Sequence, residues 1–325
     1  MRIFDYICLL IILIGVGIIY KRYINKYDKD IETHQYEVIR KYLLNSSSIT
    51  SQNKPIIWIH VPYEYNARKW QSFYSRTSMD LNLPYQELTI RSIIDHNENF
   101  HICLIDDSSF VNLLPGWTID ITKMGDPIKS KARKLCLFKL IYNYGGIVVP
   151  SSFLCLQNLS VFYDVATMNN KPFVIENHNT SYTGNNNLHF MPDCSFIGSP
   201  KNNETIKQLC EFAQNSISTD YTQESIFLGE FNKWCLLSIN NNKMNLINGS
   251  QVGTKTENGK PILIEELINA DYLNLPNDKK LIGVYIPADK LLARNSLNWF
   301  CYLKSSEILK ANTAISKYFI IAKVN

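Results

Sequence analysis

The chain has 325 residues, of which 46% are hydrophobic and 19% are charged. This composition is typical of a globular protein and excludes an intrinsically disordered one. The formal net charge of +4 is small and comes without a long basic run, so the sequence indicates no nucleic-acid partner.

An apolar run from Tyr6 to Tyr20 follows the first residues of the chain. A helix that crosses the hydrocarbon core needs about 20 residues, with roughly 17 as the lower limit, and the run meets that limit if Asp5 lies at the headgroup boundary. Because no small-x-small cleavage site follows the run, an uncleaved anchor is favoured over a signal peptide. We therefore predict a single-pass membrane protein whose anchor covers residues 1–26. Lysine and arginine are more frequent after the run than before it, which places the globular part in the cytosol.

Residues 27–54 are predicted to form a helical stalk and a linker. A charged, helix-compatible stretch is followed there by a run rich in serine and asparagine that ends at Pro55. The remaining residues, 55–325, show no firm internal boundary, so they are predicted to form one domain.

Strands and helices alternate along this domain. In the first half, strands are predicted at 55–61, 100–107, 117–121 and 147–152, and helices at 66–81, 85–97, 108–116 and 126–146. The second half is less regular: helices are predicted at 204–216 and 222–239, and the segments 172–177, 194–200 and 281–292 are recognisable without an assigned structure. The β-α-β order predicts an α/β fold with a mainly parallel sheet and flanking helices, which would bind ligands at the carboxyl ends of its strands.

Seven cysteines lie outside the predicted anchor, an odd number without a C-x-x-C pair, and several of them sit inside apolar runs. This pattern is typical of reduced core thiols, and it favours neither a disulfide framework nor a zinc site. The seven are Cys103, Cys136, Cys155, Cys194, Cys210, Cys235 and Cys301.

The segments "FKLIYNYGGIVV" and "SSFLCLQNL" resemble a sugar-transferase family that carries a D-x-D motif. The family includes capsular polysaccharide synthesis proteins and the fungal initiating α-1,6-mannosyltransferase. Tyr142, Tyr144, Gly145 and Gly146 match its Y-x-Y-G-G signature, and the resemblance covers about a third of the chain. It implies a GT-A fold, which is a Rossmann-like sheet that binds a nucleotide-sugar, and a glycan or glycoprotein acceptor.

The chain departs from this family at charged positions. The two aspartates of the family's D-x-D motif fall on Pro150 and Ser152, with Ser151 between them, and its helix aspartate and arginine fall on Lys134 and Leu137. Two carboxylates at positions i and i+2 of a strand face the same side and can hold a divalent cation. The Mn²⁺ or Mg²⁺ expected in the family therefore lacks its carboxylate ligands here, so no metal site and no cofactor are predicted.

Two alternatives remain for the basic residues at the start of the 126–146 helix, which are Lys129, Lys131, Arg133 and Lys134. They could hold a diphosphate without a metal, because a helix N-terminus favours anions. Otherwise they form the solvated face of an amphipathic helix.

Acidic residues give further candidates for the pocket. Asp106 and Asp107 would either contact a ribose or a base or, as an exposed pair, cap the following turn. Asp193 would either face the pocket as a base or lie in a solvent-exposed loop. No catalytic residue can be assigned. The candidates for a nucleotide-sugar pocket are Asp106, Asp107, Lys131, Lys134, Tyr144, Gly145, Gly146, Ser151, Ser152 and Asp193.

Two functions follow as hypotheses. The first is a membrane-anchored, glycosyltransferase-like protein without the usual metal-dependent activity. The second is an inactive pseudo-glycosyltransferase that acts as a membrane-bound scaffold or binding module. Losing two neighbouring carboxylates relieves like-charge repulsion, a change that a pseudoenzyme can accept.

Overall fold

The computed structural model describes residues 15–20, 54–62, 83–178, 190–219, 229–269, 273, 275–276 and 280–324. The chain divides into two compact units, Met1–Leu43 and Leu44–Asn325. In the first unit, residues 15–20 are helical, and the rest of the predicted anchor and the stalk lie outside the described residues, as does the predicted helix at 66–81. Within the described ranges, no helix has the length and apolar character needed to cross a membrane.

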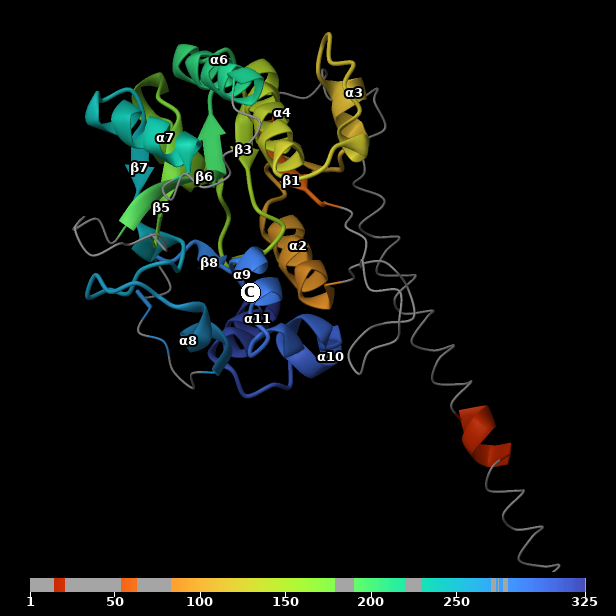
Figure 1. The fold of residues 1–325 in the computed structure, drawn as a ribbon. Helices are drawn as coiled ribbons and strands as arrows, with labels where there is room; N and C mark the ends of the chain where they lie inside the picture. Colours follow the sequence, from red (N-terminus) through yellow and green to blue (C-terminus); the bar gives the residue numbers. More distant parts are fainter. Residues whose placement is uncertain are drawn as a thin grey trace, which may run out of the picture. The chain divides into compact units, whose positions relative to one another are not determined.

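A six-stranded sheet forms the centre of the second unit, with the strand order β2-β1-β3-β6-β5-β7 (Figure 1). Strand β1 pairs in parallel with β2 and β3, and β5 pairs in parallel with β7. Strand β6 runs antiparallel to both of its neighbours, so all the other strands point the same way. The strands are β1 Ile56–His60, β2 His101–Ile105, β3 Gly146–Val148, β5 Phe173–His178, β6 Phe190–Ser199 and β7 Asn245–Ile247.

Helices flank this sheet, which confirms the predicted α/β fold with a mainly parallel sheet. The α-helices of the second unit are α2 Pro84–His96, α3 Ser109–Leu113, α4 Ile128–Tyr144, α5 Ser160–Ala166, α6 Glu204–Thr219, α7 Glu230–Asn240, α8 Ile264–Asn269, α9 Ala288–Ala293, α10 Ser305–Ile308 and α11 Ala314–Val324. Short 3₁₀ helices are η2 Ile121–Lys123, η3 Met168–Asn170, η4 Gly249–Gln251 and η5 Asn298–Tyr302.

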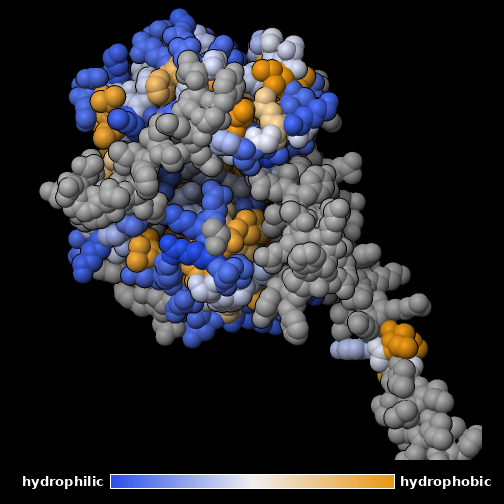
Figure 2. Space-filling view, viewed as in Figure 1, coloured by the Kyte–Doolittle hydropathy of each residue, from blue (hydrophilic) through white to orange (hydrophobic). Residues whose placement is uncertain are grey.

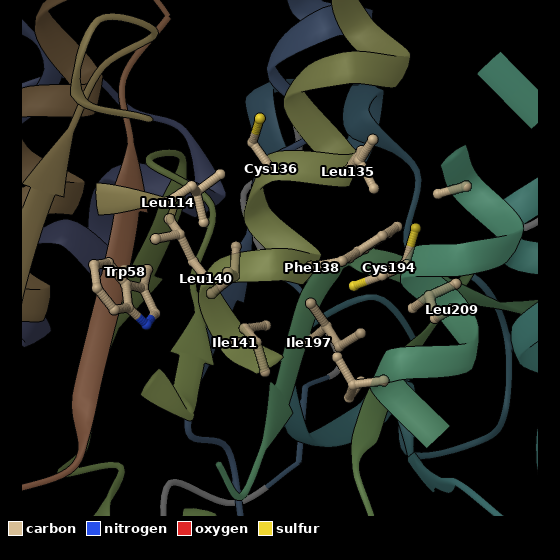
Figure 3. Close-up of a cluster of buried hydrophobic side chains, with 14 of the residues drawn as sticks. Trp58, Leu114, Leu135, Cys136, Phe138, Leu140, Ile141, Cys194, Ile197 and Leu209 are labelled. Atoms are coloured by element: carbon tan, nitrogen blue, oxygen red, sulfur yellow. The ribbon is translucent and has the colours of Figure 1, made fainter. Parts of the chain in front are cut away.

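Helix α4 covers one face of the sheet together with α6 and α7. Its apolar residues recur at helical spacing. Figure 3 shows Leu140 of this helix toward Trp58 of β1, and Phe138 toward Cys194 of β6 and Leu209 of α6. Burying a leucine or phenylalanine side chain stabilises the fold by about 1.5–3 kcal/mol. The continuous apolar runs of β1 and β2 follow from this arrangement, because a parallel sheet is covered on both faces.

A second apolar cluster surrounds a small antiparallel sheet made of β4 (Phe153–Cys155) and β8 (Gly283–Tyr285). Residues of α2, α8 and α11 pack in this cluster. The strand predicted at 147–152 is therefore wrong in its extent. Pro150 has no N–H to donate, its carbonyl accepts the Phe153 N–H at 3.0 Å, and the resulting turn separates β3 from β4.

The strand predicted at 117–121 is also wrong. The Asp120 carboxylate accepts hydrogen bonds from the backbone N–H of Thr122 at 3.0 Å and from its hydroxyl at 2.5 Å, and this cap starts η2. Aspartate side chains compete with strand pairing through such local bonds. The helix predicted at 222–239 is found from Glu230 onward, and residues 220–228 lie outside the described part of the chain.

Candidate functional site

The carboxyl ends of the parallel strands gather charged side chains from several elements. His60 ends β1, Asp106 and Asp107 follow β2, and Pro150 follows the last paired residues of β3. Helix α4 leads into β3, so it begins at this same edge of the sheet. The edge is therefore where the sheet topology predicts a ligand site.

Asp107 is the centre of a buried ionic network at this edge. Its Oδ1 accepts hydrogen bonds from Arg133 Nε at 2.9 Å, and Arg133 Nη2 donates to its Oδ2 at 2.8 Å. His60 Nε2 lies 2.9 Å from Oδ1, and Lys129 Nζ lies 3.9 Å from Oδ2. Burial alone would raise the pKa of Asp107, but the bonds and charges of His60 and Arg133 hold it well below its ordinary value.

Asp106 has a different role from its neighbour. Its Oδ1 accepts hydrogen bonds from the Ser108 hydroxyl at 2.7 Å, from the Ser109 hydroxyl at 2.6 Å and from the Ser109 N–H at 2.9 Å. Asp106 therefore caps the turn that begins α3, one of the two alternatives for the pair. The other alternative, a contact with a ligand, stays open for Asp107. Both oxygens of its carboxylate already accept hydrogen bonds from Arg133.

The basic residues of α4 are mostly paired with acids of the chain itself. Lys131 Nζ lies 3.6 Å from Glu230 Oε1, and both side chains are largely buried. Lys129 and Arg133 contact Asp107, as described above. The alternative of a solvated helix face is therefore wrong for these three residues, because their charges form ion pairs that join α4 to the segment after β2 and to α7.

Lys134 differs from these three residues. It is exposed, its ammonium lies 5.7 Å above the centre of the Phe231 ring, and within the described ranges it makes no ion pair. Cys194, Asp193 and Asp289 together hold its pKa above the ordinary value, against the opposing effect of desolvation. Lys134 is therefore a cation at neutral pH that is available to a ligand.

Asp193 lies in β6 beside this lysine. Its Oδ2 accepts a hydrogen bond from Asn177 Nδ2 at 2.7 Å, and its Oδ1 accepts one from the Ser195 N–H at 2.9 Å. Asp193 is half-buried in a strand, so its placement in a solvent-exposed loop is wrong. Both carboxylate oxygens already have donors, but the charge also acts on Lys134, Lys290 and Tyr285.

Ser151 and Ser152 lie directly after β3, in the turn that leads to β4, and are only 8% and 4% exposed. The Ser151 carbonyl accepts the Thr89 hydroxyl at 2.5 Å, and the Ser152 carbonyl accepts the Ile286 N–H at 3.2 Å. The turn is thus held between α2 and the residue after β8. In the described part of the chain, no three His, Cys, Asp or Glu side chains are grouped so that they could hold a metal ion.

The structure does not bring Tyr144, Gly145 and Gly146 to this site. They lie at the end of α4 and the start of β3, which is the opposite edge of the sheet from Asp107. Trp58 Nε1 donates to the Gly145 carbonyl at 3.0 Å, and Tyr144 donates its hydroxyl to the Leu113 carbonyl at 2.7 Å. Gly146 has φ +97°, and a Cβ there would lie 2.1 Å from the Ile56 carbonyl oxygen. The Y-x-Y-G-G signature therefore has a structural role in this chain.

A pocket that the sequence did not predict opens beside α9. Polar side chains from β5, β8 and α9 share it with apolar residues that precede and begin α8. Figure 2 shows that the surface over α9, on one side of this pocket, is hydrophilic. The pocket residues used below are Asn177, Thr254, Ile262, Leu263, Glu265, Tyr285, Pro287, Lys290 and Arg294. The segment 281–292 was recognisable in the sequence, but no motif marked its side chains.

Comparison with known proteins adds no family assignment. No family model matches the chain, and no curated protein matches it at a significant level.

Proposed function

We propose that the chain is a membrane-anchored, glycosyltransferase-like protein with a GT-A domain that binds a nucleotide-sugar without a divalent cation. The mainly parallel sheet and the charged residues at its carboxyl edge support a site there. The observation that carries the proposal is Lys134, an exposed cation that makes no ion pair with the described residues and lies where the resembling family has an aspartate.

The physical argument compares charges. In a metal-dependent site, acidic side chains hold a cation that neutralises the diphosphate as it leaves. Where the resembling family has acids, this chain has neutral residues at 150 and 152 and a cation at 134. A lysine ammonium is a compact charge with three donors and can contact a diphosphate directly. The change of sign at Lys134 therefore compensates for the loss of the metal ligands.

The second candidate is a pseudo-glycosyltransferase that acts as a membrane-bound scaffold or binding module. The buried turn at Ser151 and Ser152 favours it, because this turn closes the position where the family holds its metal. The two candidates differ in turnover, since both allow a nucleotide-sugar to bind.

Thermal unfolding of the full-length protein, with a panel of uridine and guanosine diphosphate sugars in EDTA, tests the proposal. A ligand at 100 times its Kd stabilises the native state by about 2.7 kcal/mol. We expect one nucleotide-sugar to raise the Tm of the wild type in EDTA. The same nucleotide-sugar should leave the Tm of Lys134→Gln unchanged. The control Lys123→Gln removes a charge from a side chain that is 83% exposed and should respond like the wild type.

The same samples separate the two candidates. Release of free nucleoside diphosphate in the presence of a glycan acceptor indicates an active transferase, and binding without release indicates a binding module. If no nucleotide-sugar changes the Tm, with or without Mn²⁺, the proposal is contradicted.

A further inference from the structure

We propose that the pocket beside α9 binds a small organic anion, and that Lys290 contacts its charged group. This pocket is distinct from the Lys134 site. It lies between the end of β5, the residues that precede and begin α8, strand β8 and helix α9.

Lys290 is a cation in the wall of this pocket. Arg294 also lines the pocket, but it is ion-paired with Glu265. Within the described ranges Lys290 makes no ion pair, although its side chain is half-buried. Desolvation lowers the pKa of Lys290, while the charge of Asp193 opposes that shift. An amine that has lost part of its hydration and makes no ion pair with the described residues is stabilised by an anion that enters the pocket.

The other walls of the pocket define the rest of the ligand. Ile262, Leu263 and Pro287 supply an apolar side, while Asn177 and Thr254 supply donors and acceptors. A bare ion would use only the lysine. A sugar phosphate or a sugar acid would use the lysine and also the apolar and polar walls, because its ring has an apolar face and several hydroxyls. The chemistry therefore fits an anionic sugar, with either a phosphate or a carboxylate.

Asp193 links this pocket to the proposed nucleotide site, because its charge acts on both Lys134 and Lys290. Lys134 lies on α4, which packs against the six-stranded sheet. Lys290 lies on α9, which follows β8 of the two-stranded sheet. If the protein is a sugar transferase, the anionic sugar is its acceptor. That assignment rests on the proposed function, whereas binding of the anion does not.

Calorimetric titration of the full-length protein with glucose 6-phosphate, glucuronate and inorganic phosphate tests the inference. We expect one of the two sugars to bind more tightly than inorganic phosphate, and Lys290→Gln to weaken that binding about tenfold or more. Lys310→Gln makes the same change of charge at an exposed position outside the pocket and should bind like the wild type. Tighter binding of glucose 6-phosphate would identify the phosphate as the recognised group, and tighter binding of glucuronate would identify the carboxylate.

Three outcomes would overturn the inference. These are the absence of binding by either sugar, equal binding by wild type and Lys290→Gln, and binding of inorganic phosphate alone. Lys134→Gln should leave the sugar titration unchanged. Because the nucleotide experiment depends on Lys134 and this one on Lys290, either proposal can fail while the other stands.

Discussion

The ionic network around Asp107 allows a strong test of the structure, because its sequence neighbour provides an internal control. Asp107 and Arg133 are 7% and 9% exposed, and two hydrogen bonds join them. Removing one partner of a buried ion pair costs about 3–5 kcal/mol, because the other charge stays buried without compensation. For Asp107→Asn we expect a loss of about 3 kcal/mol in the free energy of unfolding, near the lower limit because asparagine keeps one acceptor.

Asp106→Asn is the matched control. Asparagine caps a turn about as well as aspartate does, so we expect a change below about 1 kcal/mol. Urea unfolding at pH 7, followed by the fluorescence of the buried Trp58 and the other tryptophans, measures both variants. Equal losses for the two variants would refute the assignment of one aspartate to a buried pair and the other to a cap.

The pH dependence of the same variants provides an independent check. The native pKa of Asp107 lies well below its ordinary value, because the contributions of His60 and Arg133 outweigh desolvation. Such a carboxylate contributes stability that is present above its unfolded pKa of about 3.9 and is lost as the pH falls toward the native pKa. The stability difference between wild type and Asp107→Asn should therefore be constant from pH 7 to about 5 and shrink below about 4. A difference that grows on acidification would contradict this sign.

Two further predictions concern a glycine and the thiols. Gly146→Ala should destabilise the fold by at least about 2 kcal/mol in thermal unfolding, because Gly146 has a positive φ and a Cβ there meets the Ile56 carbonyl. Gly125→Ala is the control and should change the stability little, because a Cβ there has nothing within 4 Å. Similar losses for both variants would contradict the turn geometry. Burial raises the pKa of Cys194 to about 11 and that of Cys103 to about 12, and all seven described cysteines are buried. Iodoacetamide at pH 7.5 should therefore label none of these seven before urea is added, and mass spectrometry measures the labelling. Rapid labelling of any of these seven in the native protein would show that it is not a core thiol.

The main elements of the sheet were predictable because their signals are local. Strands β1 and β2 are continuous apolar runs, and α4 carries apolar residues at helical spacing before a glycine stop. The segment at 117–121 has a strand-like composition, but a single side-chain cap from Asp120 outweighs it. The pairing of β4 with β8 joins segments far apart in the chain, and no local pattern encodes it.

The sequence indicated which edge of the sheet gathers the candidate residues, but not which of them pair with one another. The β-α-β order located the carboxyl edge, where Asp107, Lys131, Lys134 and Asp193 are found. The sequence could not show that Lys131 pairs with Glu230 while Lys134 makes no ion pair with the described residues, because both depend on how α7 packs beside α4. The Y-x-Y-G-G signature was assigned to the pocket by resemblance, although its residues shape the opposite edge of the sheet.

The most direct test of the central claim is a titration of the full-length protein with the nucleoside diphosphate of the nucleotide-sugar that binds. The Kd is measured in EDTA and in Mn²⁺, for the wild type and for Lys134→Gln. Metal-independent binding through Lys134 predicts the same Kd in both buffers and a Kd at least about tenfold higher in the variant, as the loss of a charge-assisted hydrogen bond implies. Binding that requires Mn²⁺, or that is unchanged in Lys134→Gln, would contradict it.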